Sequence, residues 1–284
     1  MVYQLAKQDD RVFYIGSDLG IGTLDDFKAE MPDRFFMEGI SEANIIGMAA
    51  GLALEGKIPY VNTIATFITR RCFDQIVIDL CLHNVDVKLI GNGGGLVYAP
   101  LGPTHQAIED IAILRAVPNM TIVAPADADE MRRLMPLTVD YHGPVYIRLA
   151  KGYDPIVSSP DHRFEIGKAI PMKQGSDVLI LTTGVTLNQG LEAVGLLAKQ
   201  GVSAGVLHCH TVKPLDTEAV LDLAGDVRAL VTIEEHSVVG GLGSAIAELI
   251  AEAGFDPTKQ FRRIGLPDVF ADQYGSQASL MERY

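Results

Sequence analysis

Cysteine is scarce in this sequence of 284 residues. Cys72, Cys81 and Cys209 do not form a disulfide framework, and so small a set favours a reducing cytoplasm. The sequence also lacks an apolar run long enough to span a bilayer, and its N-terminus lacks the apolar core of a signal peptide. These absences predict a cytoplasmic protein with no membrane partner.

Positive charge is also in short supply. The sequence has 23 Lys and Arg against 36 Asp and Glu, which gives a formal net charge of -13. Nucleic acid and anionic membranes repel such a chain, so we expect neither as a partner. An anionic substrate would need a local basic pocket, or one supplied by another chain. Common catalytic signatures are missing as well, because no GxGxxG, P-loop, GxSxG, HExxH or CxxC pattern occurs.

Hydrophobic residues, by contrast, are plentiful at 48%, and the length suggests about two domains. Apolar runs typical of strands buried on both faces alternate with helical stretches. In the first half, strands are expected at 12–18, 58–65, 85–92, 120–126 and 144–150, and helices at 42–55, 70–82, 104–116 and 127–140. Thr104 is expected to cap the third of these helices, and Asp127 with Glu130 the fourth.

Residues 151–165 break this pattern with Pro, Ser and Asp, which is typical of a linker. Beyond it, strands are expected at 178–184, 202–210 and 229–236, with helices at 186–200 and 242–254. The strand–helix–strand order implies right-handed crossovers and parallel sheets. We therefore predict an α/β fold of two doubly wound domains, each with a mostly parallel sheet. The expected boundaries are 1–155 for the first domain, 156–164 for the linker and 165–284 for the second domain.

Glu42 is the most informative position, because this lone carboxylate opens a helix of small and apolar residues. One interpretation is a helix-start acid beside Ser41, stabilised by the helix dipole. The other is a ligand-binding acid. A helix that is apolar on all sides is buried, and small residues such as Gly47 and Gly51 permit close approach. The carboxylate would then lie at the mouth of a core or of a subunit interface.

Aromatic and basic residues follow the expected strand at 58–65, in the run ATFITRRCFDQI. Phe67 comes at the end of that strand, where parallel sheets place ligands. Phe67 and Phe73 also suit plain core packing. Arg70 and Arg71 are equally compatible with a solvated helix face.

Three consecutive glycines and a histidine mark the segment GNGGGLVYAPLGPTHQAIEDI (91–111). The glycines give little bulk and great backbone freedom, which suits a ligand site or a mobile surface loop. His105 is expected at a helix N-terminus, where the dipole disfavours imidazolium. It is either a neutral imidazole for proton transfer or a hydrogen-bonded helix-start residue. His208 and His210 face one side of a strand, but no acidic or Cys/His cluster lies near them in sequence, so no metal site is predicted.

Taken in order, these segments resemble the transketolase family. The resemblance runs through SDLG (17–20), GISEANIIGMAAGLA (39–53), ATFITRRCFDQI (65–76), GPTHQAIEDIAILRAVPNM (102–120) and GPVYIRLAKG (143–152), and more loosely through TVKPLD (211–216), EEHSVVGGLGSAIAE (234–248) and GLPDVF (265–270). It covers nearly the whole chain. It implies a domain at 1–155 that binds the pyrimidine of thiamine diphosphate, followed by a transketolase C-terminal domain at 165–284.

The resemblance also implies a role for each candidate residue. In the family, a glutamate at the place of Glu42 hydrogen-bonds the aminopyrimidine and favours the imino tautomer that takes the proton from C2 of the thiazolium. Phe67 matches the aromatic that stacks on the pyrimidine, and Phe73 is expected at the cofactor too. His105 matches a catalytic, proton-handling residue of the substrate channel. Asp18 matches an acid near the cofactor and the subunit interface. The implied reaction transfers a two-carbon ketol unit from a ketose donor to an aldose acceptor.

One family element is missing: the GDG…N motif that holds the diphosphate through Mg²⁺. The chain therefore resembles the C-terminal subunit of a split transketolase, whose N-terminal partner subunit would bring the metal site. The resemblance implies a working site between subunits, self-association through the pyrimidine-binding domain, and an α₂β₂ heterotetramer.

The sequence departs from the family where sugar phosphates bind. Gly93 replaces the usual histidine, Leu101 an aspartate, Lys151 an arginine and Gly22 a serine. Lysine keeps the charge but not the bidentate fork, and leucine cannot read a hydroxyl. We therefore expect a modified, non-phosphorylated or differently charged ketose, with Arg70 or Arg71 as further basic groups. The expected substrate-binding set is His105, Lys151, Arg70, Gly93 and Leu101.

Three alternatives stay open. A deoxyxylulose-phosphate synthase-like protein, or the β subunit of a 2-oxoacid dehydrogenase, would use a 2-oxoacid donor. The retained GPTHQ favours a transketolase, whereas the lost sugar contacts weaken that preference. A non-catalytic partner subunit would keep the fold without turnover. A stand-alone pair of flavodoxin-like domains has no phosphate loop in its favour.

Overall fold

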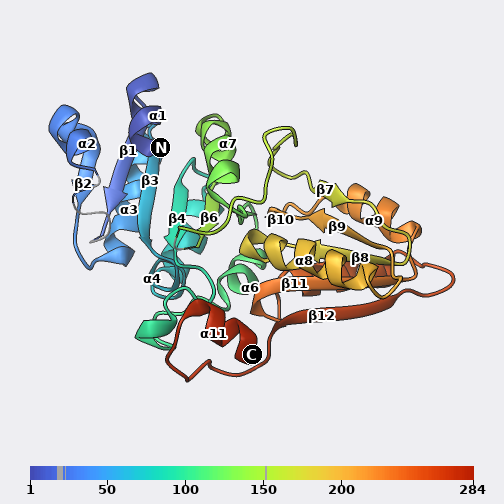
Figure 1. Cartoon of the computed structure of the whole chain (residues 1–284). Coiled ribbons are helices and arrows are strands. Elements are labelled where there is room, and N and C mark those ends of the chain that lie inside the picture. Colours follow the sequence, from blue (N-terminus) through green and yellow to red (C-terminus); the bar gives the residue numbers. More distant parts are fainter. Residues whose placement is uncertain (18–21, 23, 151) are drawn as a thin grey trace.

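The computed structural model describes residues 1–17, 22, 24–150 and 152–284. Two predicted site residues, Asp18 and Lys151, lie outside these described residues. The described chain forms two α/β units side by side, the first drawn in blue to green and the second in yellow to red (Figure 1). Each unit is built on one sheet, and the predicted α/β fold with two mostly parallel sheets is confirmed.

The first sheet has seven strands in the order β10-β5-β6-β4-β3-β1-β2. Its strands are parallel except β10, which pairs antiparallel with β5 and comes from the second half of the chain. The strands are β1 Val12–Gly16, β2 Phe35–Met37, β3 Ile58–Ile64, β4 Lys88–Asn92, β5 Thr121–Val123, β6 Val145–Leu149 and β10 Thr211–Lys213. The helices are α1 Val2–Gln8, α2 Asp25–Glu30, η1 Pro32–Arg34, α3 Glu42–Leu54, α4 Ala65–Arg70, α5 Phe73–Gln75, η2 Ile76–Leu82, η3 Ala99–Leu101, α6 Asp110–Arg115 and α7 Ala128–Val139.

Helices cover both faces of the first sheet. Residues of α3, α4, η2 and α6 form one hydrophobic cluster with Ile15 of β1. Residues of α1, α2 and α7 form another with Tyr14, the preceding residue of the same strand. Neighbouring strand residues point to opposite faces, so the two clusters lie on opposite sides of the sheet. Burial on both sides explains why these strands are continuous apolar runs.

The second sheet has five strands in the order β12-β11-β8-β9-β7, with β7 antiparallel to β9. Its strands are β7 Ile170–Lys173, β8 Val178–Thr182, β9 Ala204–His208, β11 Ala229–Ser237 and β12 Gln260–Leu266. Its helices are η4 Gly184–Thr186, α8 Leu187–Ala198, α9 Thr217–Gly225, α10 Leu242–Glu252 and α11 Gln277–Arg283. Helices α9 and α10 pack in one cluster and α8 in another. The last helix, α11, reaches back below the first unit (Figure 1), where Leu280 packs with Leu96 and Ile108.

Every predicted strand is present, whereas β2, β7, β10 and β12 lie outside the predicted set. The edge strands β2 and β12 are half-buried or exposed along most of their length, so they lack the continuous apolar pattern of central strands. The predicted helix 70–82 begins earlier, as α4 at Ala65, and its second half is a π-helix, η2.

The helix predicted to begin at Thr104 was placed too early, because α6 starts only at Asp110. The preceding residues form turns instead, and Ala107 pairs with Gly95 across an isolated bridge. His105 is therefore not at a helix N-terminus, and the dipole argument made for it from sequence is wrong. Asp127 does cap α7, accepting hydrogen bonds from the second and third backbone N–H groups of that helix.

Only one face of α3 is buried within this chain. Ile45, Ile46 and Ala49 are fully buried, whereas an added Cβ at Gly47 or Gly51 would meet open space. The predicted burial on all sides is thus not provided by the chain alone. No helix of the described ranges is both long and apolar enough to cross a membrane.

Candidate active site

The candidate residues gather at one edge of the first sheet. Phe67 lies in α4, directly after β3, and His105 lies in the segment that follows β4. Glu42 opens α3, shortly after β2. Parallel strands end at the same edge of their sheet, which is where α/β folds bind ligands. The structure brings these three residues to one edge of the sheet.

Glu42 is almost fully buried, with 5% of its surface exposed. Its Oε2 accepts a hydrogen bond from Nη1 of Arg71 at 3.1 Å. Ser41, the N-cap residue of α3, makes no capping bond and donates its hydroxyl to the carbonyl of Glu38 instead. The Glu42 carboxylate is therefore turned toward the end of α4 and paired with the cation of Arg71, which follows that helix.

Phe67 contacts two candidate neighbours, namely Arg71, which pairs with Glu42, and His105. The guanidinium carbon of Arg71 lies 3.8 Å from the centroid of the Phe67 ring. The His105 ring meets Phe67 edge-on, with centroids 5.1 Å apart and planes at 62°. Phe73, the other predicted cofactor residue, opens α5 with 37% of its surface exposed, and no ring contact joins it to Phe67 in the described part of the chain.

Arg70 holds the His105 segment in place. Its Nη2 donates to the carbonyl of Gln106 at 3.0 Å, and its Nε donates to the carboxylate of Glu109. Within that segment, the hydroxyl of Thr104 is hydrogen-bonded to Nδ1 of His105 at 2.9 Å. The cation of Arg70 is thus engaged by Glu109, which makes it a tether for the segment rather than a free anion-binding group.

The triple glycine is a packed loop and not a mobile one. Gly93, Gly94 and Gly95 are all buried, and an added Cβ on any of them would overlap another side chain. At Gly93 that side chain is the ring of Tyr98, and the backbone there has a φ of +75°. Position 93 therefore cannot carry the family's histidine, because Tyr98 fills its space. Leu101 lies further along the segment and is 50% exposed.

A buried charge network packs against this glycine loop. Nε of Arg148 donates to Oδ2 of Asp110 at 2.8 Å, and Tyr146 donates its hydroxyl to the same oxygen at 2.7 Å. Burial is the largest single effect on Asp110 and raises its pKa, but the Arg148 cation, His236 and the hydrogen bonds from Arg148 and Tyr146 together hold that pKa below its ordinary value. Nη2 of Arg148 also donates to the carbonyls of Ala107 and Glu235, which tie the network to both units.

Glu235 extends the network from β11 of the second unit. Its carboxylate accepts hydrogen bonds from the backbone N–H of Leu96 at 2.7 Å and from Gln277 of α11 at 2.9 Å. Burial raises the pKa of Glu235, and the Arg148 cation opposes the rise. Sequence reasoning missed Asp110, Arg148 and Glu235. The available signal was a charged side chain inside an otherwise apolar, buried strand, as in PVYIRLA and ALVTIEEH.

His208 ends β9, and His210 lies in the short segment between β9 and β10. Nε2 of His208 lies 3.2 Å from Oε2 of Glu130, which belongs to α7 of the first unit. The His210 ring stacks on Phe164 at 3.9 Å, and burial together with His208 lowers the pKa of His210 to about 3. No group of three His, Cys, Asp or Glu suited to a metal ion occurs among the described residues.

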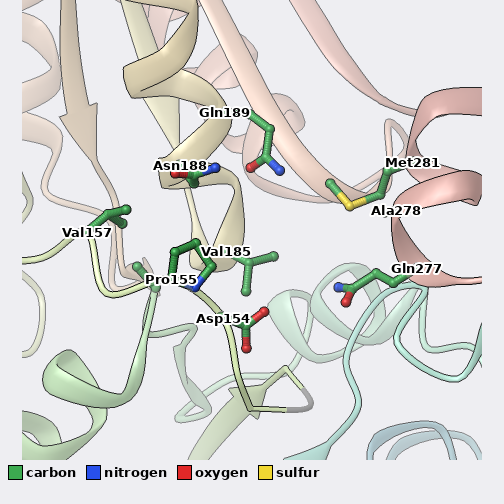
Figure 2. A pocket seen from close by; sticks show the side chains of 10 residues that line it. Asp154, Pro155, Val157, Val185, Asn188, Gln189, Gln277, Ala278 and Met281 are labelled. Atoms are coloured by element: carbon green, nitrogen blue, oxygen red, sulfur yellow. The ribbon is translucent and has the colours of Figure 1, made fainter.

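A separate cavity of about 250 Å³ lies between the two units. Figure 2 shows Asp154 and Pro155 of the inter-unit segment on one side, Gln189 of α8 above, and Gln277 of α11 opposite. Neither Glu42 nor Phe67 lines it. Its polar side chains are the amides of Asn188, Gln189 and Gln277 and the carboxylate of Asp154.

Both halves of the chain match family profiles. The family profile of the transketolase pyrimidine binding domain matches residues 1–153, and that of the transketolase C-terminal domain matches residues 167–283. A 6-deoxy-6-sulfo-D-fructose transketolase subunit from a Clostridium strain is 38% identical, over 100% of this chain and 90% of that protein. A 1-deoxy-D-xylulose-5-phosphate synthase from a Synechococcus strain is also 38% identical, over 98% of this chain but only 43% of that protein.

A solved structure shares the whole fold. It is a split-gene transketolase described as an inactive β4 tetramer, with a TM-score of 0.90 and 38% identity, and the match covers 100% of this chain and 90% of that chain. The chain therefore belongs to the transketolase family, as a subunit that carries the pyrimidine-binding and C-terminal domains of a split transketolase.

Proposed function

We propose that this chain provides the pyrimidine-binding half of a thiamine diphosphate site. The observation that carries the proposal is the grouping of the Glu42 carboxylate and the Phe67 ring around one guanidinium, that of Arg71. A carboxylate can accept a hydrogen bond from an aminopyrimidine, and an aromatic ring offers it a stacking face. A planar N–H donor already satisfies both groups, so the chemistry of the pair fits an aminopyrimidine.

When bound, thiamine diphosphate would supply the nucleophilic carbon needed for chemistry at a ketose carbonyl. Glu42 holds a proton at a pyrimidine nitrogen from a position that is almost closed to water. Phe67 sets the plane of the pyrimidine. His105, edge-on to Phe67, is placed to take or give a proton at a sugar hydroxyl. Arg70 and Glu109 keep the His105 segment at this edge.

The diphosphate and Mg²⁺ belong, in this proposal, to a partner subunit. The sequence has no GDG motif, and the described residues offer no cluster of metal ligands. An N-terminal transketolase subunit would complete the site in the cytoplasm. The three cysteines support that location, because all are buried free thiols. The description of the related β4 tetramer as inactive agrees with a requirement for a second kind of subunit.

Self-association through the first unit would use α3 and its neighbour η2. Leu54 of α3 is 63% exposed, and Ile78 and Leu82 of η2 are 45% and 71% exposed. Beside them, Gly47 and Gly51 leave the backbone of α3 open to close approach. Apolar residues gathered on a small-residue face are typical of an interface. We therefore propose an α₂β₂ heterotetramer with this face between two copies of the chain.

The proposed substrate is a ketose whose far end differs from that of the usual sugar phosphates. Tyr98 fills the space of the family's histidine, and Leu101 stands in place of an aspartate. Both changes remove polar contacts to a sugar chain. One relative is named for a sulfonated ketose, which agrees with a varied sugar terminus in this part of the family.

The alternative is a 2-oxoacid donor, favoured by the similarity to a 1-deoxy-D-xylulose-5-phosphate synthase. Both readings are tested by co-purifying the chain with its GDG-containing partner, titrating thiamine diphosphate with Mg²⁺, and assaying a ketose donor against pyruvate. Ketol transfer without release of carbon dioxide is the expected result. Release of carbon dioxide from pyruvate with no ketose turnover would overturn the transketolase reading.

A further inference from the structure

Arg71 makes both contacts that an aminopyrimidine would make at this edge. Its Nη1 donates to Oε2 of Glu42, and its guanidinium carbon lies 3.8 Å from the centroid of Phe67. So short a distance to the centroid puts the cation on the face of the ring. His105 meets the same ring edge-on, so the group stacked on Phe67 is the guanidinium.

A guanidinium and an aminopyrimidine offer similar surfaces to this pair of residues. Both are planar, both direct N–H groups at a carboxylate, and both stack on an aromatic face. Two such groups cannot lie on the same face of Phe67 and donate to the same carboxylate oxygen at once. Arg71 and the pyrimidine of the cofactor are therefore mutually exclusive at this position.

We propose that Arg71 is an internal competitor for the pyrimidine subsite. It fills the place between Glu42 and Phe67 in the free subunit and leaves when the cofactor enters. The inference rests on the proposed function, because it takes these two residues as the pyrimidine subsite.

Arg71 is the member of the group that can move. It follows the last residue of α4, and 47% of its side chain is exposed, whereas the side chain of Glu42 is 5% exposed. A long side chain at a helix end can swing into water without disturbing the buried core. Cofactor entry thus requires a rotation of Arg71 and leaves Glu42 where it is.

The competition lowers the apparent affinity for the cofactor by a modest factor. A half-exposed ion pair and a cation–π contact are each weak, so together they hold the competent, open state near a tenth of the population. An apparent dissociation constant rises by the inverse of the competent fraction. Removing the guanidinium should therefore tighten binding by about tenfold.

The test uses the complex of this chain with its partner subunit. Thiamine diphosphate binding is measured by calorimetry in saturating Mg²⁺ for the wild type and for Arg71→Gln, which removes the charge and the planar fork. We expect about tenfold tighter binding by Arg71→Gln. Arg132→Gln is the matched control, because Arg132 on α7 is 66% exposed and pairs with Asp129, far from this edge in sequence. Its dissociation constant should equal that of the wild type.

A second measurement uses the free subunit and the probe 4-amino-2-methylpyrimidine, followed by NMR titration. The probe should bind Arg71→Gln about tenfold more tightly than the wild type. In a Glu42→Ala background, Arg71→Gln should increase the affinity for the probe by less than about threefold, because the guanidinium no longer has an ion pair with Glu42 that holds it in the subsite. If Arg71→Gln unfolds, Arg71→Lys replaces it, since an ammonium keeps the charge without the flat fork.

The outcomes separate the two claims. Unchanged or weaker cofactor binding by Arg71→Gln, in a complex that binds thiamine diphosphate, overturns the competition and leaves the proposed function intact. A full tenfold gain that persists in Glu42→Ala also overturns it, because the effect would then be general charge. A complex that assembles but binds no thiamine diphosphate overturns both.

Discussion

Replacing Arg148 with methionine tests the charge network that joins the two units. The ion pair between Arg148 and Asp110 is 2.8 Å long, and the two side chains are 7% and 0% exposed. Without the cation, Asp110 remains a buried carboxylate with Tyr146 as its hydroxyl donor. The carbonyls of Ala107 and Glu235 lose their guanidinium donor at the same time.

The magnitude follows from the depth of burial. Removing one partner of a buried ion pair costs about 3–5 kcal/mol, because the remaining charge stays in a poorly polarisable interior. We therefore expect Arg148→Met to lower the free energy of unfolding by about 3–5 kcal/mol. The double variant Arg148→Met/Asp110→Asn removes both charges of this ion pair and leaves Glu235 as the buried carboxylate of the network. It should be more stable than Arg148→Met but still about 1–3 kcal/mol less stable than the wild type, because the two carbonyls remain without their donor.

Urea denaturation of the subunit, followed by far-UV circular dichroism, measures these differences. The network bonds to both units, so every unfolding transition of the chain should move to lower urea. Arg132→Met, which removes a surface cation, should change the free energy by less than about 0.5 kcal/mol. If Arg148→Met lowers the free energy of unfolding by less than about 1 kcal/mol, the reasoning is refuted. It is also refuted if the double variant is less stable than both single variants.

Three further predictions concern single positions. Glu42→Ala should leave the circular dichroism spectrum unchanged but reduce ketol transfer by the complex at least about 100-fold, and normal turnover would rule out its proposed role. Gly93→Ala should lower the free energy of unfolding by about 2–4 kcal/mol, because φ there is +75° and the Tyr98 ring fills the space; an unchanged melting temperature would contradict this. Burial is the main cause that lowers the pKa of His210 to about 3. The folded state therefore favours the neutral ring, and the free energy of unfolding has its full value above about pH 6.5. As pH falls from there toward 3, protonation of His210 in the unfolded state lowers the free energy of unfolding by up to about 5 kcal/mol. His210→Gln should flatten that decline in pH-dependent urea titrations, and an identical decline would refute the assignment.

The location of the candidate site could be predicted from the sequence because it depends on topology. Phe67 and His105 each follow a buried apolar run, and successive parallel strands end at one edge of the sheet. The order of the runs places the ends of these two strands at one edge, whereas the roles of Phe67 and His105 were expected only from the family resemblance. The start of α6 was not predictable in the same way. Gly102 has a φ of +77° and the bridge from Gly95 to Ala107 closes a turn, and neither leaves a periodic signal.

Side-chain pairing was the part that the sequence could not settle. Arg70 and Arg71 are adjacent and chemically alike, yet one pairs with Glu109 and the other with Glu42. The difference depends on the direction of each side chain at the end of α4, which composition does not encode. The contacts of Glu235 with the first unit likewise join residues more than a hundred positions apart.

The antiparallel strand β10 has a consequence for biosynthesis. It completes the first sheet at β5 but is made of Thr211–Lys213, so it leaves the ribosome only after β7, β8 and β9 of the second unit have been made. Lys213 also donates to the carbonyls of Arg115 and Val117 beside that edge. Until then, β5 is an unpaired strand edge, the kind of surface that invites aggregation. A nascent or truncated chain that ends near residue 155 would expose it, so the two units should be expressed as one piece.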